Sequence, residues 1–267
     1  MRNLVFSAAV LLAGVSLCHG EVIKGMNADG IKWNLILNFR EGSGIIAKDS
    51  STNTISTTLT NGPAWVSNRS GRGKALSFDG TDDIVVVPAG SEGLFDYGIT
   101  STFAVVVLLK NPSGGDNRIL VSKGTWSTFG WWFRTGASGA KLGIYFRNNS
   151  AFQYFDSNVS NAEFINNNWH TAAFVYRGIL HGTTGMEFWF DGVQRGVTDS
   201  GTDNGTSNFG NNANVVIGND EAITFTNYLD TIGCVMLSRD GYAPSAKGMM
   251  DLHRRLMGQQ GDLTQVQ

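Results

Sequence analysis

The feature that most constrains the fold is a series of short apolar segments separated by turn residues. Eleven such segments follow one another from residue 32 onward: Asn34–Phe39, Lys74–Phe78, Asp83–Val87, Thr102–Leu109, Ile119–Ser122, Gly130–Arg134, Lys141–Arg147, Trp169–Tyr176, Met186–Phe190, Asn214–Ile217 and Leu229–Leu237. Segments of this length and composition predict β-strands, and Asp191-Gly192 between two strand segments is typical of a hairpin. Because helices do not alternate with these strands, the pattern indicates an all-β fold, an antiparallel two-sheet β-sandwich or jelly roll.

One segment near the C-terminus has the pattern of a helix. Pro244 and Ser245 mark its start and Gly258 marks its end. Four side chains between them recur at helical spacing and share a face: Met249, Leu252, His253 and Leu256. We expect one short C-terminal helix that caps the sandwich.

The composition fits one folded domain and excludes some classes of partner. The 267 residues include 16 Phe and 7 Trp, and so much ring surface needs a core. We therefore treat residues 32–257 as a single domain. The net charge of -2 comes with scattered Lys and Arg, so we expect neither nucleic acid nor an anionic membrane surface as a partner.

The first twenty residues have the features of a secretory signal peptide. Arg2 precedes an apolar run from Leu4 to Leu17, and Gly20 is a small residue at the end of the segment. The run is shorter than the roughly 20 residues that span a bilayer, so we predict a secreted, extracellular protein without membrane insertion. Residues 21–31 then form an N-terminal lead segment, and residues 258–267 form a polar C-terminal tail.

Cleavage after residue 20 removes Cys18 and leaves one cysteine. Cys234 lies within an apolar run, so we predict a buried thiol in preference to a reactive one. No internal disulfide can form in the mature chain, and its stability must come from its core.

Five blocks of sequence carry a resemblance to a known family. They are LNFREGSGIIAKDSS, TNGPAWVSNRSGRGKALSFDGTDDIVVVP, WHTAAFVYRG with MEFWFDGVQRG, VVIGND, and LDTIGCVMLSRDGYAPSAKGMMDLHRRL. In content and order they resemble laminin-G-like domains of the concanavalin A-like lectin and glucanase superfamily. The most specific piece is Ala75–Gly80 followed by Asp82 and Asp83. The resemblance implies a concanavalin A-like jelly roll, but it does not imply one activity, because the fold carries lectins, adhesion modules and enzymes.

Catalytic motifs are weakly represented. A glycosidase needs two carboxylates at a fixed separation, and the E-x-D-x-x-E string of related glucanases does not occur. Glu187 and Asp191 alternate with Trp189 on one predicted face, but we interpret them as a surface glutamate and a hairpin aspartate. His170, His181 and His253 stand alone, and G-x-S-x-G, H-E-x-x-H and paired C-x-x-C motifs are missing from the sequence.

Three aspartates lie in blocks that resemble family positions around a structural ion. They are Asp49, Asp79 and Asp230. Calcium takes six to eight oxygen ligands, which loops rich in Asp, Asn and Gly can supply, so one structural calcium ion is predicted. The alternative is that each aspartate caps its own turn.

Aromatic residues exceed what alternate burial in one sandwich demands. Rings that remain exposed can stack on the apolar faces of sugars, which predicts a ligand site drawn from Trp126, Trp131, Trp132, Tyr145 and Trp189. Adjacent strand residues point to opposite faces, so only one of Trp131 and Trp132 can enter the inter-sheet core. We expect the other on an outer or concave face, exposed to a ligand.

The segment from Phe103 to Leu109 is apolar on both faces, so its second face must be covered. The candidates are a neighbouring loop, the lead segment 21–31 or another copy of the protein. The last possibility would make an extracellular homopolymer.

Four sequons, at Asn68, Asn148, Asn158 and Asn204, further predict a glycoprotein.

Together these features predict a secreted, non-catalytic laminin-G-like module for recognition of extracellular glycans or glycoproteins, or for adhesion. The first alternative is a structural glycoprotein that assembles with itself into a filament or matrix. The second is a glycan hydrolase or lyase.

Overall fold

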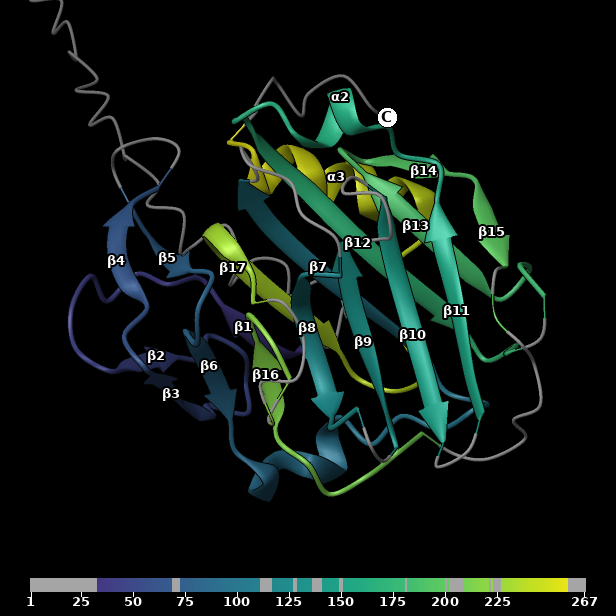
Figure 1. Ribbon diagram of the computed structural model, residues 1–267, viewed down its shortest axis with the longest axis horizontal. Helices are drawn as coiled ribbons and strands as arrows, with labels where there is room; N and C mark the ends of the chain where they lie inside the picture. Colours follow the sequence, from purple (N-terminus) through teal and green to yellow (C-terminus); the bar gives the residue numbers. More distant parts are fainter. Residues whose placement is uncertain are drawn as a thin grey trace, which may run out of the picture.

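The chain folds as two antiparallel sheets packed face to face (Figure 1). This computed structural model describes residues 33–68, 73–110, 117–126, 129–135, 141–148, 151–180, 182–199, 201, 209–220, 222 and 227–258. The predicted signal peptide and lead segment lie outside the described residues, as do His181, Asn204 and residues 259–267 of the predicted tail. No helix among the described residues is long and apolar enough to cross a membrane.

The first sheet contains eight strands. Its path runs β14 (Val193–Arg195), β13 (Met186–Phe190), β12 (Trp169–Arg177), β7 (Thr102–Lys110), β17 (Leu229–Ser238), β5 (Lys74–Asp79) and β4 (Ala64–Ser67). Strand β1 (Trp33–Leu37) also pairs with the long strand β17. The centre of this sheet is therefore β12, β7 and β17, which are far apart in sequence.

The second sheet contains nine strands. Its path runs β15 (Val197–Asp199), β11 (Ala151–Ser157), β10 (Leu142–Asn148), β9 (Gly130–Thr135), β8 (Ile119–Gly124), β16 (Val215–Ile217), β6 (Ile84–Val87), β3 (Ser56–Thr60) and β2 (Ile46–Lys48). Strands β8 to β11 are sequential and pair as a meander. Residues close in sequence therefore meet on this part of the sheet.

The inter-sheet core is built by alternate residues of both sheets. On β7 the inward side chains are Phe103, Val105, Val107 and Leu109, and on β9 they are Trp131 and Phe133. Phe103 stacks on Tyr97 with ring centroids 3.9 Å apart and lies 5.8 Å from the Trp131 ring. This alternation confirms the predicted β-sandwich and explains why strand periodicity was visible in the sequence.

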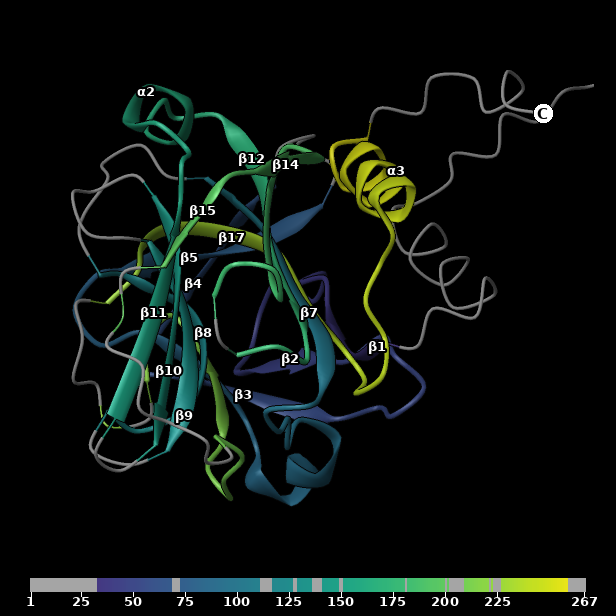
Figure 2. The ribbon, with the colours of Figure 1, turned by 90° about the vertical axis from the view of Figure 1, so that its right-hand side faces the viewer.

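Helix α3 (Ala246–Leu256) covers the second apolar face of β7. Its buried residues Met249, Leu252 and Leu256 belong to a second apolar cluster with the outward residues of β7: Ala104, Val106 and Leu108. Figure 2 shows α3 on the outer side of the eight-stranded sheet, opposite strands β9 to β11. The predicted helix is thus present, and it packs on the face for which the sequence analysis had named a loop, the lead segment or a second copy as the cover.

Two other helical turns complete the fold. The short helix α2 (Asn161–Phe164) begins at Ser160, whose side chain and that of Glu163 form a capping box. A 3-10 turn, η1 (Ala89–Leu94), links β6 to the segment that leads into β7. The eleven predicted strands are all present, whereas β2, β3, β4, β11, β14 and β15 were not identified in the sequence.

Candidate functional site

The outer face of the nine-stranded sheet carries a row of aromatic side chains. Because Trp131 and Phe133 point into the core, Trp132 points outward from β9. Strand pairing places Tyr145 of β10 opposite Trp132, and Tyr154 of β11 opposite Tyr145. Three neighbouring strands therefore present one continuous row of rings.

Two further rings join this row. Trp126 lies with its centroid 5.6 Å from Trp132 and 5.3 Å from Tyr145, in T-shaped geometry. Phe152 lies 6.0 Å from Tyr154 in a stacked arrangement. We call the five residues Trp126, Trp132, Tyr145, Phe152 and Tyr154 the ring platform.

The ring platform is partly open to solvent. Trp132 is fully buried, whereas Trp126, Tyr145 and Tyr154 are half-buried and Phe152 is 38% exposed. Burial raises the pKa of the Tyr145 hydroxyl above its ordinary value of 10, so this phenol is neutral at physiological pH. The surface therefore combines ring faces with phenolic hydroxyl groups, as a sugar-binding surface does.

A buried ion pair supports the platform from one side. Arg134 has no exposed surface, and its guanidinium lies 3.9 Å from the Tyr145 ring centroid. Its Nη2 is 3.3 Å from Asp156 Oδ1, and its Nη1 donates to Asn117 Oδ1 at 2.9 Å. Burial raises the pKa of Asp156, although Arg134 opposes this shift. The pair fits because residue 143 is a glycine, since a Cβ there would lie 2.7 Å from Asp156 Oδ1.

A second arginine lies on the platform without a carboxylate. Arg147 points outward from β10, and its Cζ lies 4.7 Å from the Trp126 ring centroid. Its Nε is buried and has no hydrogen-bond partner. No carboxylate among the described residues forms an ion pair with it.

The structure brings together three of the five predicted ligand residues. Trp126, Trp132 and Tyr145 belong to the ring platform, but Trp131 and Trp189 do not. Trp131 has no exposed surface in the inter-sheet core, and Trp189 is 5% exposed in the cluster beneath α3, where its Nε1 donates to Glu187. Neither ring offers a face to a sugar. Of the adjacent residues Trp131 and Trp132, Trp132 points outward. We expected this outward ring to be exposed, but it is buried because Trp126 packs against it.

Phe152, Tyr154, Arg134 and Arg147 complete this surface and were not among the predicted ligand residues. Phe152 and Tyr154 lie on β11, a strand that the sequence analysis did not identify. The alternation of Phe152, Tyr154 and Asp156 with Gln153 and Phe155 is the signal that would have indicated it.

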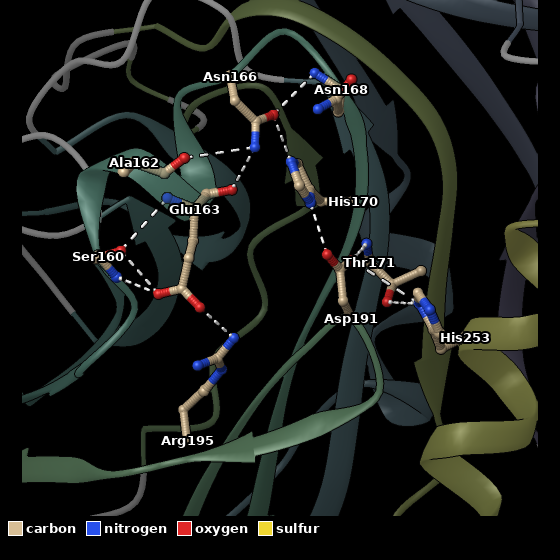
Figure 3. A network of polar contacts seen from close by, with 10 residues as sticks. All are labelled: Ser160, Ala162, Glu163, Asn166, Asn168, His170, Thr171, Asp191, Arg195 and His253. Carbon is tan, nitrogen blue, oxygen red and sulfur yellow. Dashed lines mark hydrogen bonds and ion pairs between the residues drawn. The ribbon is translucent and has the colours of Figure 1, made fainter.

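A polar network joins α2, β12 and α3 at another part of the molecule (Figure 3). His170 Nδ1 lies 2.7 Å from Asp191 Oδ2, and its Nε2 lies 2.8 Å from Asn166 Oδ1. Asn166 Nδ2 donates to the Glu163 carbonyl oxygen, so its Oδ1 must face the histidine. His253 of α3 contacts Thr171 Oγ1 at 2.8 Å. His170 also stacks on Phe190, so its surroundings fit the structural role expected from the sequence.

The two carboxylates considered for catalysis are engaged by neighbouring groups. Glu187 pairs with Arg177 at 2.5 Å and accepts from Trp189 Nε1 at 2.9 Å. Asp191 lies in the β13–β14 turn with φ 51° and accepts from the Thr171 amide as well as contacting His170. Asp191 is the hairpin aspartate that its sequence context indicated. Glu187 is half-buried and paired, so its description as a simple surface glutamate was incomplete.

The predicted calcium residues are not gathered in one place. Asp49 accepts hydrogen bonds from the amides of Ile36, Ser51 and Ile55, so it caps its own turn. Within the described part of the chain, the acidic residues whose oxygens lie within 4.8 Å of one another are Asp79, Asp82 and Asp83. Neither Asp49 nor Asp230 belongs to this group.

The Asp79 loop supplies some of the ligands that calcium takes, but its carboxylates also bind the backbone. Asp79 Oδ1 accepts from the Thr81 amide, and Asp83 Oδ2 accepts from the Asp79 amide. Burial is the main cause of a raised pKa at Asp83, and the charges of Asp79 and Asp82 add to it. Calcium binding stays a prediction, and a melting scan before and after chelation tests it.

The sequons and the cysteine have clear surroundings where they are described. Asn158 is exposed at the end of β11, and its Oδ1 accepts from the Gly196 amide. The Asn68 side chain accepts from the Gly73 amide, and Asn148 ends β10. Glycosylation stays a prediction.

Cys234 is buried in the cluster beneath α3, and burial raises its pKa to about 12, which confirms the expected buried thiol.

Comparison with solved structures supports the fold. The binding domain of Paraclostridial Mosquitocidal Protein 1 is similar with a TM-score of 0.62 and 11% identity, over 84% of this chain and 52% of that one. A structure of botulinum neurotoxin type C, whose cell entry is dependent upon interaction with two ganglioside molecules, gives 0.62 and 12%, over 87% and 53%. Domain 4 of AbnA, an extracellular GH43 arabinanase from Geobacillus stearothermophilus in complex with arabinotriose, gives 0.58 and 16%, over 84% and 98%.

These likenesses are structural. The chain spans about half the length of the two toxin chains, and identities of this size show a shared fold alone. No family model matches the sequence, and no curated protein matches it.

Proposed function

We propose that the protein is a secreted, non-catalytic glycan-binding module of the laminin-G-like type, and that its ligand lies on the ring platform. The observation that carries the proposal is the platform itself: five contacting rings on one outer sheet face, four of them partly accessible. Pyranose and furanose rings present C–H faces that pack on aromatic rings, while their hydroxyl groups bind phenols and guanidinium groups.

The structural neighbours make this proposal more specific than an adhesion surface of any kind. One neighbour is a domain in complex with arabinotriose, and cell entry of another, botulinum neurotoxin type C, is dependent upon interaction with two ganglioside molecules. The fold likeness supports sugar recognition here because this chain also carries an aromatic site on its outer face, and function lies in such a site.

The test is glycan binding by variants that remove a ring without disturbing the core. The mature protein is screened on a glycan array, and the best ligand is titrated by calorimetry against Trp126→Ala and Phe152→Ala. We expect each variant to bind at least about tenfold more weakly, which corresponds to the roughly 1.4 kcal/mol of one lost stacking contact.

Trp65→Ala is the matched control. Trp65 is a half-buried tryptophan on β4 in the other sheet, where its Nε1 donates to the Gly44 carbonyl. Melting curves identify any variant that loses its fold. Unchanged affinity in Trp126→Ala and Phe152→Ala, with both variants folded, would place the ligand elsewhere.

Self-assembly is the alternative function, but the sequence feature that favoured it now has another explanation. The doubly apolar strand β7 suggested a second copy as its cover, but α3 of the same chain occupies that place. Light scattering over a range of concentrations separates the two functions. We expect a constant monomer mass, whereas a mass that grows with concentration would favour a structural glycoprotein.

A further inference from the structure

No carboxylate among the described residues pairs with the cation at the edge of the ring platform. The guanidinium of Arg147 is half-buried over Trp126, and its buried Nε makes no hydrogen bond. A partly desolvated guanidinium offers five donors in a fixed fork, and leaving buried donors unused costs stability. The position of Arg147 on the platform therefore favours a ligand that brings acceptors with it.

The other charges on this face do not neutralise Arg147. Arg134 and Asp156 form their own ion pair beneath Tyr145, so together they add no net charge. Asp220 accepts from the Trp126 amide but is fully buried and makes no ion pair with Arg147. Lys141 is exposed and lies close enough to Asp156 to lower the pKa of that carboxyl. Among these five named groups, the three cations Arg134, Arg147 and Lys141 exceed the two carboxylates by one charge.

We propose that the glycan bound at the ring platform is anionic, with its carboxylate or sulfate group held by the Arg147 guanidinium. This inference rests on the proposed glycan-binding function and specifies its ligand class. The planar fork of Arg matches two oxygens of a carboxylate or sulfate. The Trp126 ring below the guanidinium holds it in place by a cation–π contact and limits its loss of side-chain entropy on binding.

The chemistry has two sources that the structure does not separate. Sialic and uronic acids carry a carboxylate, whereas sulfated sugars carry a sulfate ester. Each group carries one negative charge and presents two neighbouring oxygen atoms that accept hydrogen bonds. A test must therefore compare a neutral sugar with both kinds of anionic derivative.

The experiment uses one sugar in three forms. Lactose, 3′-sialyllactose and 3′-sulfolactose are titrated into the mature protein by calorimetry, with an array of neutral, sialylated, uronic-acid and sulfated glycans beside them. We expect at least one anionic form to bind about tenfold or more tightly than its neutral parent, and the stronger of the two anionic arms identifies the anion.

Variants of Arg147 show whether this side chain carries the preference. Arg147→Gln is expected to lower the affinity for the anionic sugar about tenfold more than the affinity for the neutral sugar, which removes the preference. Arg147→Lys keeps the charge but loses the fork, so it should retain only part of the preference. Arg254→Gln is the matched control, because it changes the net charge equally on α3, at the opposite side of the molecule.

The possible failures are distinct. Equal binding of neutral and anionic sugars, or a preference that survives Arg147→Gln, overturns the anionic assignment while the glycan-binding function stands, provided that Trp126→Ala still weakens binding. If Arg254→Gln also loses the preference, the preference comes from the net charge of the protein and not from Arg147. That result would also overturn the assignment. Binding of no member of the array would contradict both proposals.

Discussion

The two outer faces of this sandwich follow the same strand geometry but differ in the side chains they present. On the eight-stranded sheet the outward residues of β7 are Ala104, Val106 and Leu108, which α3 covers. On the nine-stranded sheet the outward residues of β9 and β10 include Trp132, Arg134 and Tyr145, and neither α2 nor α3 covers them. The comparison teaches that small aliphatic residues suit packing against a helix, whereas rings beside fixed cations leave a surface that suits the proposed ligand.

The difference also explains how each face is held together. The helix-covered face depends on burial of aliphatic surface, which contributes roughly 25 cal/mol per Å². The ring platform depends on ring-edge contacts and an ion pair, which fix geometry and add little net stability. We therefore expect truncation of a buried side chain on the first face mainly to lower stability, and removal of an exposed ring on the second mainly to weaken binding.

The largest expected effect is the loss of helix packing. Leu252→Ala removes a buried side chain from the cluster beneath α3 and leaves a cavity, so we expect a loss of about 3 kcal/mol in unfolding free energy. Urea denaturation measures it. Ile179→Ala, at a residue 48% exposed, should change the value by less than about 0.5 kcal/mol. A loss below about 1 kcal/mol in Leu252→Ala would mean that α3 is not packed as described.

The second-largest effect is expected from a substitution that creates a steric clash beneath the ring platform. In Gly143→Ala the new methyl carbon would lie 2.7 Å from Asp156 Oδ1 and 3.1 Å from Arg134 Cζ, which must separate the ion pair. We expect a loss of about 2 kcal/mol and weaker glycan binding, because Arg134 supports Tyr145. Gly90→Ala is the control, since its Cβ meets no atom within 4 Å. Equal stability and binding in both variants would show that the pair does not hold the platform.

A smaller effect is expected where the polar network meets the helix-covered face. Asp191→Asn keeps the shape and tolerates the positive φ of this turn, but it removes the negative charge beside His170. We expect a loss of about 1.5 kcal/mol, with no change in glycan affinity. Asp251→Asn on α3 is the control, because this carboxylate is 31% exposed and pairs only with side chains of its own helix, and it should cost less than about 0.5 kcal/mol. A change in glycan affinity in Asp191→Asn would show that the helix-covered face and the ring platform are coupled, which would contradict our description.

The smallest effect is a pH dependence at α2. Hydrogen bonds from the backbone and side chain of Ser160, with help from Arg195, lower the pKa of Glu163 to about 2. The ionised form favours folding, so this stability is present above about pH 4.5 and is lost as the pH falls towards 2. Because the side chain is largely exposed, we expect only about 0.5 kcal/mol. The difference between wild type and Glu163→Gln in urea denaturation should shrink between pH 6 and pH 3. A constant difference would contradict the assignment.

The fold was predictable because the signals that specify it are local. Alternation and turn residues identified β7, β9, β10, β12 and β13, and Pro244 with Ser245 identified the start of α3. The strands that escaped prediction are short, such as β2, β3 and β14, or carry mixed side chains, such as β11. Their strand character comes from pairing with neighbours, and local composition does not record it.

The site was predictable only in part, because it depends on register. An excess of rings pointed to Trp126, Trp132 and Tyr145, but only the pairing of β10 with β11 places Tyr154 beside Tyr145. The burial of Trp189 depends on α3, which begins more than fifty residues later in the chain. Asp49 looked like a metal ligand because its turn, which it caps with its own carboxylate, resembles an ion-binding loop.

The most direct test of the central claim is to follow the tryptophan indole N–H signals by NMR while the best glycan ligand is added. The chain has 7 Trp residues, distributed between the two faces and the core, and single Trp→Phe variants assign their signals. We predict that the Trp126 signal, with Trp132 beneath it, shifts in a saturable way while the signals of Trp33 and Trp189 beneath α3 stay in place. Shifts confined to Trp33 and Trp189, or no shift at Trp126 when the ligand is saturating, would contradict the account.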